Sequence, residues 1–307
     1  MAGSRPVGRR ISFLSTYPQI SVIVSTYQRP EHLRRSLLSL ALQRGVDEPF
    51  EVVVCEDGST ESTAEVVERF AKTADFPIRL VTQEHRGFQA ARCRNNGALA
   101  SRAPYLIFFD GDCIFPSNHL QQHLRARRPG WVRTGDSYRL EAEMSRRIDD
   151  AAIASEAFVR YVSKRERRRL RRRWIKEECY SIMRHRTKPK VMAGNLAVWR
   201  CDFERVNGFD EQFVGWGCED DDLGQRLRQA GVRIGPIFGY TQAYHLWHPS
   251  DPSRPVKWRD GANVEYLSRR DKPTRCIRGL SRPNGTEPAL PGQKRTEARP
   301  SDPRRVA

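Results

Sequence analysis

The stretch ISVIVST, residues Ile20–Thr26, decides the fold of this chain of 307 residues. Most of its side chains are β-branched, and such a run is typical of a strand buried on both faces of a parallel sheet. Pro30 follows and suits the first turn of a helix, with leucines continuing at helical spacing. This region therefore predicts one strand–helix unit of an α/β fold.

The strand–helix unit is repeated further along the chain. Apolar runs at residues 50–60, 78–83 and 105–113 predict three more strands, with helical patterns between them, the last at residues 90–100. This alternation predicts a doubly wound, mostly parallel sheet flanked by helices. No G-x-G-x-x-G follows the first strand, which argues against a dinucleotide-binding site.

Polar side chains follow the ends of all four predicted strands. Ligands of such sheets bind beyond the carboxyl ends of the strands. Each set also fits an ordinary turn, but their common position predicts a binding site. In strand order the sets are Thr26, Tyr27 and Arg29; Glu56 and Asp57; Gln83 and Arg86; Asp110 and Asp112.

Asp110-Gly111-Asp112 is the most specific of these sets. Two carboxylates on either side of one glycine place hard oxygen ligands together at a strand end. Such ligands suit Mg²⁺ or Mn²⁺ bridging to a diphosphate. A simple turn is the alternative, because Asp-Gly is a common turn dipeptide.

A second chemical segment is NGFDEQFVGWGCEDDD, residues 207–222. The first turn of a helix explains its four carboxylates, since negative charge favours a helix N-terminus. It does not explain Trp216 between two glycines, which allow the backbone to approach a ligand closely. We interpret the segment as a catalytic loop with an aromatic platform and a general base, leading into a helix over residues 222–230.

Two further features adjoin these segments. A predicted strand at residues 191–200 contains Gly194, which indicates close approach of a ligand or of other backbone. His245 and His248 flank Trp247 and add imidazoles to a chain that already offers paired carboxylates. Burial in the core is the commoner fate of a single histidine.

The net charge of +17 is unevenly distributed. Residues 1–19 carry +3, residues 146–190 carry +10 and residues 251–307 carry +7, which leaves −3 for the presumed core. A slightly acidic core argues against a nucleic-acid-binding fold. The segment 160–190 is interpreted first as a solvated basic helix or loop, and alternatively as a contact with anionic lipid or an acidic acceptor.

Composition also indicates the cellular compartment and the domain organisation. There is no apolar run of 18 residues, so we expect no transmembrane helix. The seven cysteines include no CxxC pair, which favours reduced thiols in the cytoplasm. A peripheral contact with the inner face of the membrane is left open. We expect a flexible basic arm at 1–18, a catalytic domain at 19–269 and a disordered tail at 270–307. The catalytic domain divides into a nucleotide-sugar half (19–113), a variable basic insert (114–190) and an acceptor half (191–269).

Together the motifs resemble family-2 glycosyltransferases with the GT-A fold, over roughly residues 20–268. The Thr-Tyr-x-Arg-Pro end of the first strand, the EDGS turn, QEHRGFQAARCRNNG and FFDGDC match that family in order. The GFQA…RNxG segment looks like the bacterial chondroitin and hyaluronan synthase domains. The segments NGFDEQFVGWGCEDDDL and HLWH look like the C-terminal part of beta-1,4-galactosyltransferases.

The resemblance implies roles for individual residues. Asp220 would be the general base and Glu219 its partner at the donor sugar, while the next two aspartates open the helix. Mn²⁺ or Mg²⁺ would be held by Asp112, Asp110 and His245 or His248, with His245 preferred. Cys218, where galactosyltransferases have glycine, departs from the pattern. The nucleotide sugar would be bound by Thr26, Tyr27, Arg29, Glu56, Asp57, Gln83, Arg94, Asp110, Gly111 and Trp216.

The implied activity is a metal-dependent, inverting transfer of a sugar from a nucleotide sugar, with a UDP-sugar favoured. The acceptor would be a hydroxyl of a glycan or a small molecule. A retaining transferase is the alternative within enzymes. A nucleic-acid-binding or scaffold protein that uses the basic insert is the alternative outside them.

Overall fold

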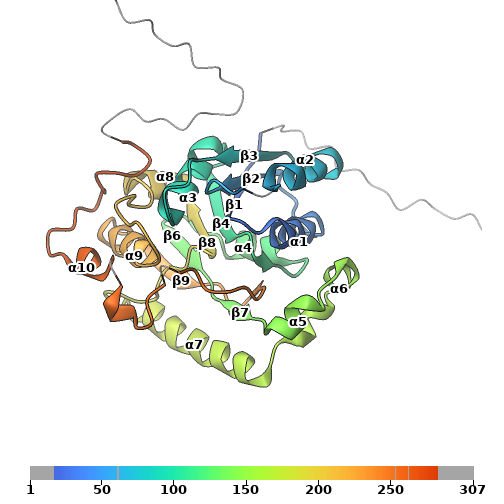
Figure 1. Ribbon diagram of the computed structural model, residues 1–307. Helices are drawn as coiled ribbons and strands as arrows, with labels where there is room; N and C mark the ends of the chain where they lie inside the picture. Colours follow the sequence, from blue (N-terminus) through green and yellow to red (C-terminus); the bar gives the residue numbers. More distant parts are fainter. Residues whose placement is uncertain (1–16, 61, 253, 262, 283–307) are drawn as a thin grey trace, which may run out of the picture.

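The computed structural model describes residues 17–282, apart from positions 61, 253 and 262 (Figure 1). Most of the predicted basic arm and the end of the predicted tail, residues 283–307, lie outside the described residues. In the described part of the chain, none of the helices is long and apolar enough to cross a membrane.

A seven-stranded sheet forms the centre of the fold, in the order β3-β2-β1-β4-β8-β6-β9. Neighbours are parallel from β3 to β4, β8 runs antiparallel to β4 and β6, and β9 is parallel to β6. The predicted mostly parallel sheet is therefore confirmed. The strands are β1 (Ile20–Thr26), β2 (Phe50–Glu56), β3 (Ile78–Thr82), β4 (Tyr105–Asp110), β6 (Trp131–Thr134), β8 (Asn195–Trp199) and β9 (Arg233–Pro236).

Helices cover both faces of this sheet (Figure 1). Successive side chains of one strand point to opposite faces of the sheet. In β4, Phe108 packs in one core with residues of α3, α8 and α9, whereas Phe109 packs in the other core with α1 and α4. The helices are α1 (Pro30–Ala41), α2 (Thr63–Thr73), α3 (Ala90–Ala100), α4 (His119–Ala126), α8 (Arg200–Arg205) and α9 (Glu219–Gln229).

A second, three-stranded sheet was not predicted. It has the order β5-β10-β7 and consists of β5 (Cys113–Ile114), β10 (Ala243–His245) and β7 (Ser137–Arg139). His245 is paired in register with Cys113, and the backbone N–H of Leu246 donates to the carbonyl of Asp112 at 2.8 Å. This small sheet therefore brings the C-terminal histidines to the end of β4.

The basic insert is mainly helical. It contains α5 (Ala142–Arg146), α6 (Asp150–Ala154), a 3₁₀ turn at Ala157–Tyr161 and the 19-residue helix α7 (Lys164–Ile182). Ser163 caps α7, since its hydroxyl accepts from the N–H of Glu166 at 3.2 Å. A 3₁₀ turn at Trp258–Asp260 and α10 (Asn263–Ser268) follow near the C-terminal end of the described chain.

Three predicted boundaries were wrong. The strand predicted at 191–200 begins only at Asn195, and the helix predicted at 222–230 begins at Glu219, so all four carboxylates occupy its first turn. The tail predicted from residue 270 is packed on the fold up to residue 282. Cys276 is buried, Leu280 packs against the core and Arg282 forms an ion pair with Glu211.

Candidate active site

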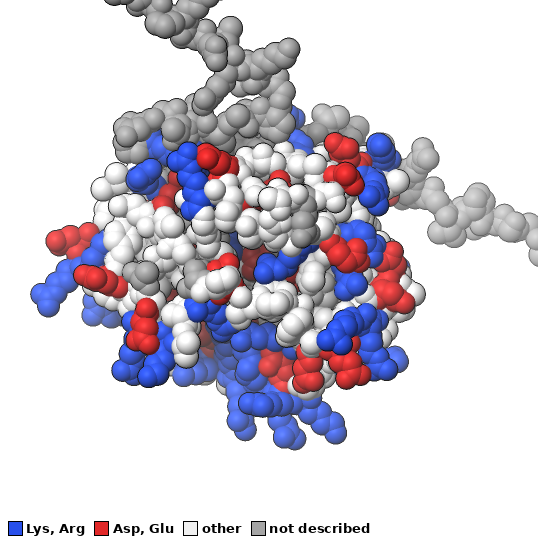
Figure 2. Space-filling model, viewed as in Figure 1, with Lys and Arg blue, Asp and Glu red and all other residues white. Residues whose placement is uncertain are grey.

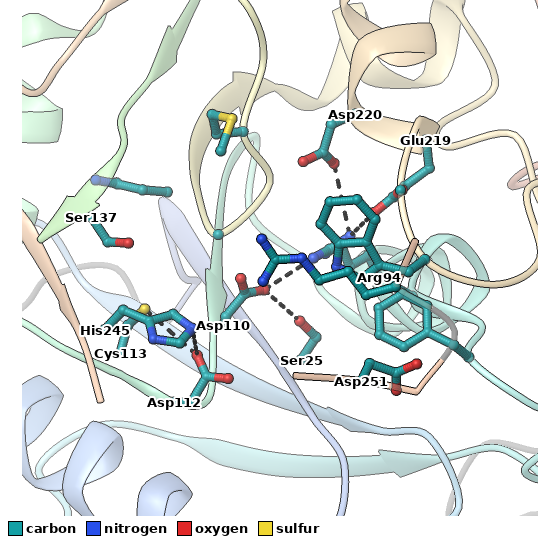
Figure 3. A pocket seen from close by; sticks show the side chains of 18 of the residues that line it. Ser25, Arg94, Asp110, Asp112, Cys113, Ser137, Glu219, Asp220, His245 and Asp251 are labelled. Atoms are coloured by element: carbon teal, nitrogen blue, oxygen red, sulfur yellow. Dashed lines mark hydrogen bonds and ion pairs between the residues drawn. The ribbon is translucent and has the colours of Figure 1, made fainter. Parts of the chain in front are cut away.

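A cavity of about 650 Å³ lies at the carboxyl ends of β1, β2 and β4. Its remaining walls come from the small sheet, the loop before β8 and the N-terminal turn of α9. The cavity is thus built from both halves of the sequence, and Figure 3 shows the side chains that meet in it. Most residues predicted for the rim line this hollow, although Glu56 and Gln83 lie behind its surface. Arg86 does not line it either, because its exposed side chain pairs with Glu84 at 2.7 Å.

Arg94 joins the two halves of the site (Figure 3). Its guanidinium is 3.0 Å from Asp110 Oδ1, 3.0 Å from Glu219 Oε1 and 3.8 Å from Asp220 Oδ1. Burial alone would lower the pKa of Arg94, but the three carboxylates raise it above its ordinary value. Ser25 also donates to Asp110 Oδ1 at 3.2 Å. Arg94 is therefore a fixed positive charge that orients the carboxylates around it.

A candidate metal centre consists of Asp112, His245 and His248. Their ligand atoms all lie within 4.8 Å of one another. His248 Nε2 is 3.0 Å from Asp112 Oδ2, and His245 Nε2 is 3.6 Å from Asp112 Oδ1. Burial alone would raise the pKa of Asp112, but the two histidines and Arg29 hold it well below its ordinary value. The carboxylate is therefore ionised and able to act as a ligand.

The chemistry of these three side chains fits a divalent transition metal. One carboxylate and two imidazoles suit Mn²⁺ better than Mg²⁺, which prefers an all-oxygen shell. Both histidines reach Asp112, although the sequence had favoured His245. Asp110, also predicted as a ligand, is outside this group, because Arg94 and Ser25 hold its carboxylate.

The four carboxylates of α9 have four different surroundings. Burial, followed by repulsion from Glu219, raises the pKa of Asp220 to about 8, and the N–H of Ala193 donates to its Oδ2 at 3.0 Å. Asp221 pairs with Lys190 at 2.6 Å, and the fully buried Asp222 pairs with Arg226 at 2.6 Å. Asp220 is thus the carboxylate whose proton affinity suits proton transfer near neutral pH.

The loop before α9 presents Trp216 to the cavity. Gly215 and Gly217 have φ values of +83° and +91°, a region that favours glycine. Cys218 has φ +77° in the same region, where a side chain is disfavoured. The guanidinium of Arg254 lies 5.2 Å from the centre of the Trp216 ring. No sequence pattern had indicated this cation–π contact.

The predicted nucleotide site lies at the carboxyl ends of β1 and β2. Thr26, Tyr27, Arg29 and Asp57 line the cavity. Burial raises the pKa of Asp57, although Gln83 and the N–H of Gln89 donate to its carboxylate at 2.6 and 3.1 Å. Both hydrogen bonds fix the orientation of the Asp57 carboxylate.

Three residues predicted at the nucleotide site lie behind the cavity wall. Glu56 is buried, and Gln83 supports Asp57. Gly111 packs against β1, where a Cβ would lie 3.1 Å from the carbonyl oxygen of Ser25. Their roles are therefore in shaping the wall. A further residue, His85, was not predicted: its ring stacks on Tyr27 with centroids 4.3 Å apart.

A chain of hydrogen bonds connects Asp57 with the C-terminal segment. Arg282 donates to Asn96 at 2.7 Å, Asn96 donates to Gln83 at 2.8 Å, and Gln83 donates to Asp57. Arg282 also pairs with Glu211 at 2.7 Å. A residue far away in the sequence thus helps to position Asp57.

Gly194 and Asp136 also line the cavity, and only Gly194 had been singled out from the sequence. Gly194 was noted for close approach, and a Cβ there would lie 2.4 Å from Asp110 Oδ2. Asp136 lines the cavity and binds Arg169 and Arg173 of α7. In the sequence, Asp136 stands out only as an acidic residue after Gly135, and this dipeptide occurs in many turns.

Both halves of the chain are similar to known proteins. Residues 21–128 match the model of glycosyl transferase family 2, and residues 175–249 match a model described as the N-terminal domain of galactosyltransferase. The chain is 34% identical to validoxylamine A glucosyltransferase of Streptomyces hygroscopicus subsp. limoneus, covering 71% of this chain and 49% of that protein. It is 28% identical to the hyaluronan synthase of Pasteurella multocida, covering 82% and 27%. The chain thus spans about half the length of the glucosyltransferase.

Solved structures share the fold. TarS 1–349 of S. aureus in complex with UDP-GlcNAc has a TM-score of 0.55 at 18% identity, covering 76% of this chain and 60% of that one. The mannosyltransferase PcManGT of Pyrobaculum calidifontis, in complex with GDP-Man and Mn²⁺, has a TM-score of 0.51 at 21% identity, covering 72% and 55%. These likenesses confirm the predicted GT-A architecture.

Proposed function

Because the chain belongs to glycosyltransferase family 2, we propose that it transfers a sugar from a nucleotide sugar to a hydroxyl group of an acceptor. One observation supports this most strongly. A single cavity contains both the group Asp112, His245 and His248 and the carboxylates Glu219 and Asp220. Leaving-group stabilisation and proton removal are the two requirements of such a transfer, and each has its own set of residues here.

Asp112, His245 and His248 would hold a divalent cation, with Mn²⁺ favoured over Mg²⁺ by the two imidazoles. When bound, the ion would neutralise negative charge on the leaving diphosphate. The Mn²⁺ in the PcManGT complex is consistent with this assignment. Arg29, with a guanidinium nitrogen 3.8 Å from Asp112, adds a positive charge on the same side.

Asp220 would take the proton from the acceptor hydroxyl. Its pKa of about 8 makes it a strong base for a carboxylate once it is ionised. Glu219, held by Arg94 at 3.0 Å, would contact the donor sugar, and Trp216 would offer its ring to a sugar face. One base acting on the side opposite the leaving group would invert the anomeric centre, so we favour inversion over retention.

Asp57, Thr26 and Tyr27 would bind the nucleoside. A UDP-sugar is our first choice of donor, as in the TarS complex, although the PcManGT complex contains GDP-Man. The acceptor would be a hydroxyl of a glycan or of a small molecule. A nucleic-acid-binding scaffold would leave the three carboxylates around the buried Arg94 without a purpose.

Donor cleavage tests the proposal. UDP-, GDP- and dTDP-sugars are incubated with the protein and Mn²⁺, and nucleotide release is measured. Asp112→Asn should lower the rate by about a hundredfold or more, since it removes the anionic ligand. The matched control is Asp150→Asn, which changes an exposed carboxylate paired with Arg34. Equal rates in the two variants, or rates unaffected by chelation, would contradict the metal assignment.

Inversion is tested separately. With an accepted donor and acceptor, NMR of the product reports the anomeric configuration. Inversion together with loss of transfer in Asp220→Asn supports the assignment of the base. A product with the configuration of the donor would replace it with a retaining mechanism.

A further inference from the structure

Helix α7 presents an unusually basic surface to solvent. In Figure 2, Lys and Arg gather along the lower edge of the molecule, where Figure 1 shows α7. The acidic residues of the helix are only partly exposed or buried. The exposed basic residues of α7 are Lys164, Arg165, Arg167, Arg168, Arg171, Arg172 and Lys176.

The orientation of α7 is fixed from its inner side. Leu170 is buried, and the hydroxyl of Ser181 donates to the carbonyl of Ile234 in β9 at 2.9 Å. Arg169 and Arg173 bind Asp136, which lines the cavity. The arginines that point inward therefore have structural partners, and the outer arginines are a separate set.

Apolar side chains continue the outer face toward the C-terminal end of the helix. Ile175 is 51% exposed and Ile182 is 71% exposed. Residues 164, 168, 171, 175 and 182 follow one another at three-, four- and seven-residue spacing, which places them on one stripe of a helix. Met183, 65% exposed, directly follows the helix. One stripe thus carries cations at one end and large apolar side chains at the other.

We propose that this stripe binds the surface of an anionic lipid bilayer. The arginines would meet anionic headgroups, and Ile175 and Ile182 would enter the boundary between headgroups and acyl chains. A hydrated polyanion such as nucleic acid uses the cations alone and leaves both isoleucines in water. The bilayer is the partner that accounts for both parts of the stripe.

The position of the stripe gives the contact a consequence. Because the inner side of α7 contacts Asp136 of the cavity wall, a bilayer on the outer stripe would lie about one helix diameter, roughly 10 Å, from that wall. That arrangement suits an acceptor carried on a lipid. This last point rests on the proposed function, whereas the bilayer contact does not.

Vesicle co-sedimentation tests the contact without any measurement of transfer. The full chain is mixed with vesicles of phosphatidylcholine containing about one third phosphatidylglycerol, and with vesicles of phosphatidylcholine alone. We expect binding to the anionic vesicles that weakens as salt is raised. Arg168→Gln, Arg171→Gln and Arg172→Gln in one variant should weaken it on the order of a hundredfold.

Two further variants separate the alternatives. The charge-matched control changes three exposed arginines elsewhere, Arg44→Gln, Arg69→Gln and Arg125→Gln, and should bind nearly as the parent does. Replacing both isoleucines, Ile175→Ser and Ile182→Ser, should weaken vesicle binding about tenfold and leave binding to duplex DNA unchanged. No binding to anionic vesicles, or binding unaffected by the serine variant, overturns the proposal. Equal loss in the control triple variant would overturn it as well.

Discussion

Replacing Asp220 by asparagine should abolish sugar transfer and stabilise the protein. Burial and the neighbouring Glu219 raise the pKa of Asp220 from 3.8 to about 8. Between those two pH values the folded chain holds a proton that the unfolded chain releases, so stability falls as pH rises through this window. Asparagine has no charge to lose, and its side-chain oxygen can still accept the N–H of Ala193. The variant should therefore be free of the loss in folding stability that Asp220 causes as pH rises.

The size of the effect follows from the pKa. A tenfold change in proton affinity corresponds to about 1.4 kcal/mol, so keeping the proton on Asp220 costs roughly 4 kcal/mol at neutral pH. A quarter of the Asp220 side chain is exposed, so solvent screens part of the repulsion, and we expect a gain of about 2 kcal/mol. With an unfolding entropy of about 2.1 cal/mol/K per residue, that gain raises the Tm of a 307-residue chain by about 3 °C. Loss of the base should lower the transfer rate by a factor of about 100 to 10,000.

Thermal unfolding from pH 4 to pH 8.5, without metal or nucleotide, measures the stability difference. The gain should be absent near pH 4 and reach its maximum near pH 8, the window set by the two pKa values. Asp221→Asn is the matched control: it removes the ion pair with Lys190 at 2.6 Å and should bring no gain. An Asp220→Asn variant that is no more stable than the parent at pH 8, or that retains transfer within a factor of ten, would refute the assignment of Asp220 as a buried base.

Three other substitutions test separate parts of the site. Cys218→Gly relieves the φ of +77° but removes a buried side chain that packs with Phe213 and Leu267, so stability in chemical denaturation should change by less than about 1 kcal/mol; a larger loss would show that this packing outweighs the relief of strain. Gly194→Ala should lower the rate of donor cleavage about tenfold or more with the fold intact, because its Cβ would lie 2.4 Å from Asp110 Oδ2; an unchanged rate would mean that Asp110 can shift freely. Arg282→Ala should weaken UDP binding several-fold in calorimetry while kcat stays nearly constant, because the hydrogen-bond chain to Asp57 loses its end. An unchanged Kd would show that Asn96 and Gln83 suffice to orient Asp57.

The central sheet was predictable because its strands are buried on both faces. Ile20–Thr26 and the helix Ala90–Ala100 have the predicted bounds, since long apolar runs and helical spacing are local signals. The sheet β5-β10-β7 contains strands of two or three residues, too short for any periodic pattern. Its existence depends on contacts between segments far apart in sequence, and these bring His245 and His248 to Asp112.

The tail shows where composition misleads. The polar residues after Asp271 outnumber the apolar ones, so composition predicted disorder. The buried Cys276, the partly buried Leu280 and the ion pair of Arg282 with Glu211 outweigh that average. The ion pairs of Glu219 with Arg94 and of Asp221 with Lys190 were hidden for a similar reason, because both partners come from distant segments. Asp222 differs, since its partner Arg226 lies one turn along the same helix.

In the proposed reaction, the position of Arg94 between Asp110 and Glu219 would couple the binding of the donor to the binding of the acceptor. A donor that weakens or strengthens the ion pair of Arg94 with Asp110 would also change the strength of the interaction of Arg94 with Glu219 and Asp220. If donor binding alters acceptor affinity by some factor, acceptor binding must alter donor affinity by the same factor. The order in which the two substrates bind would then depend on the competition for a single positive charge.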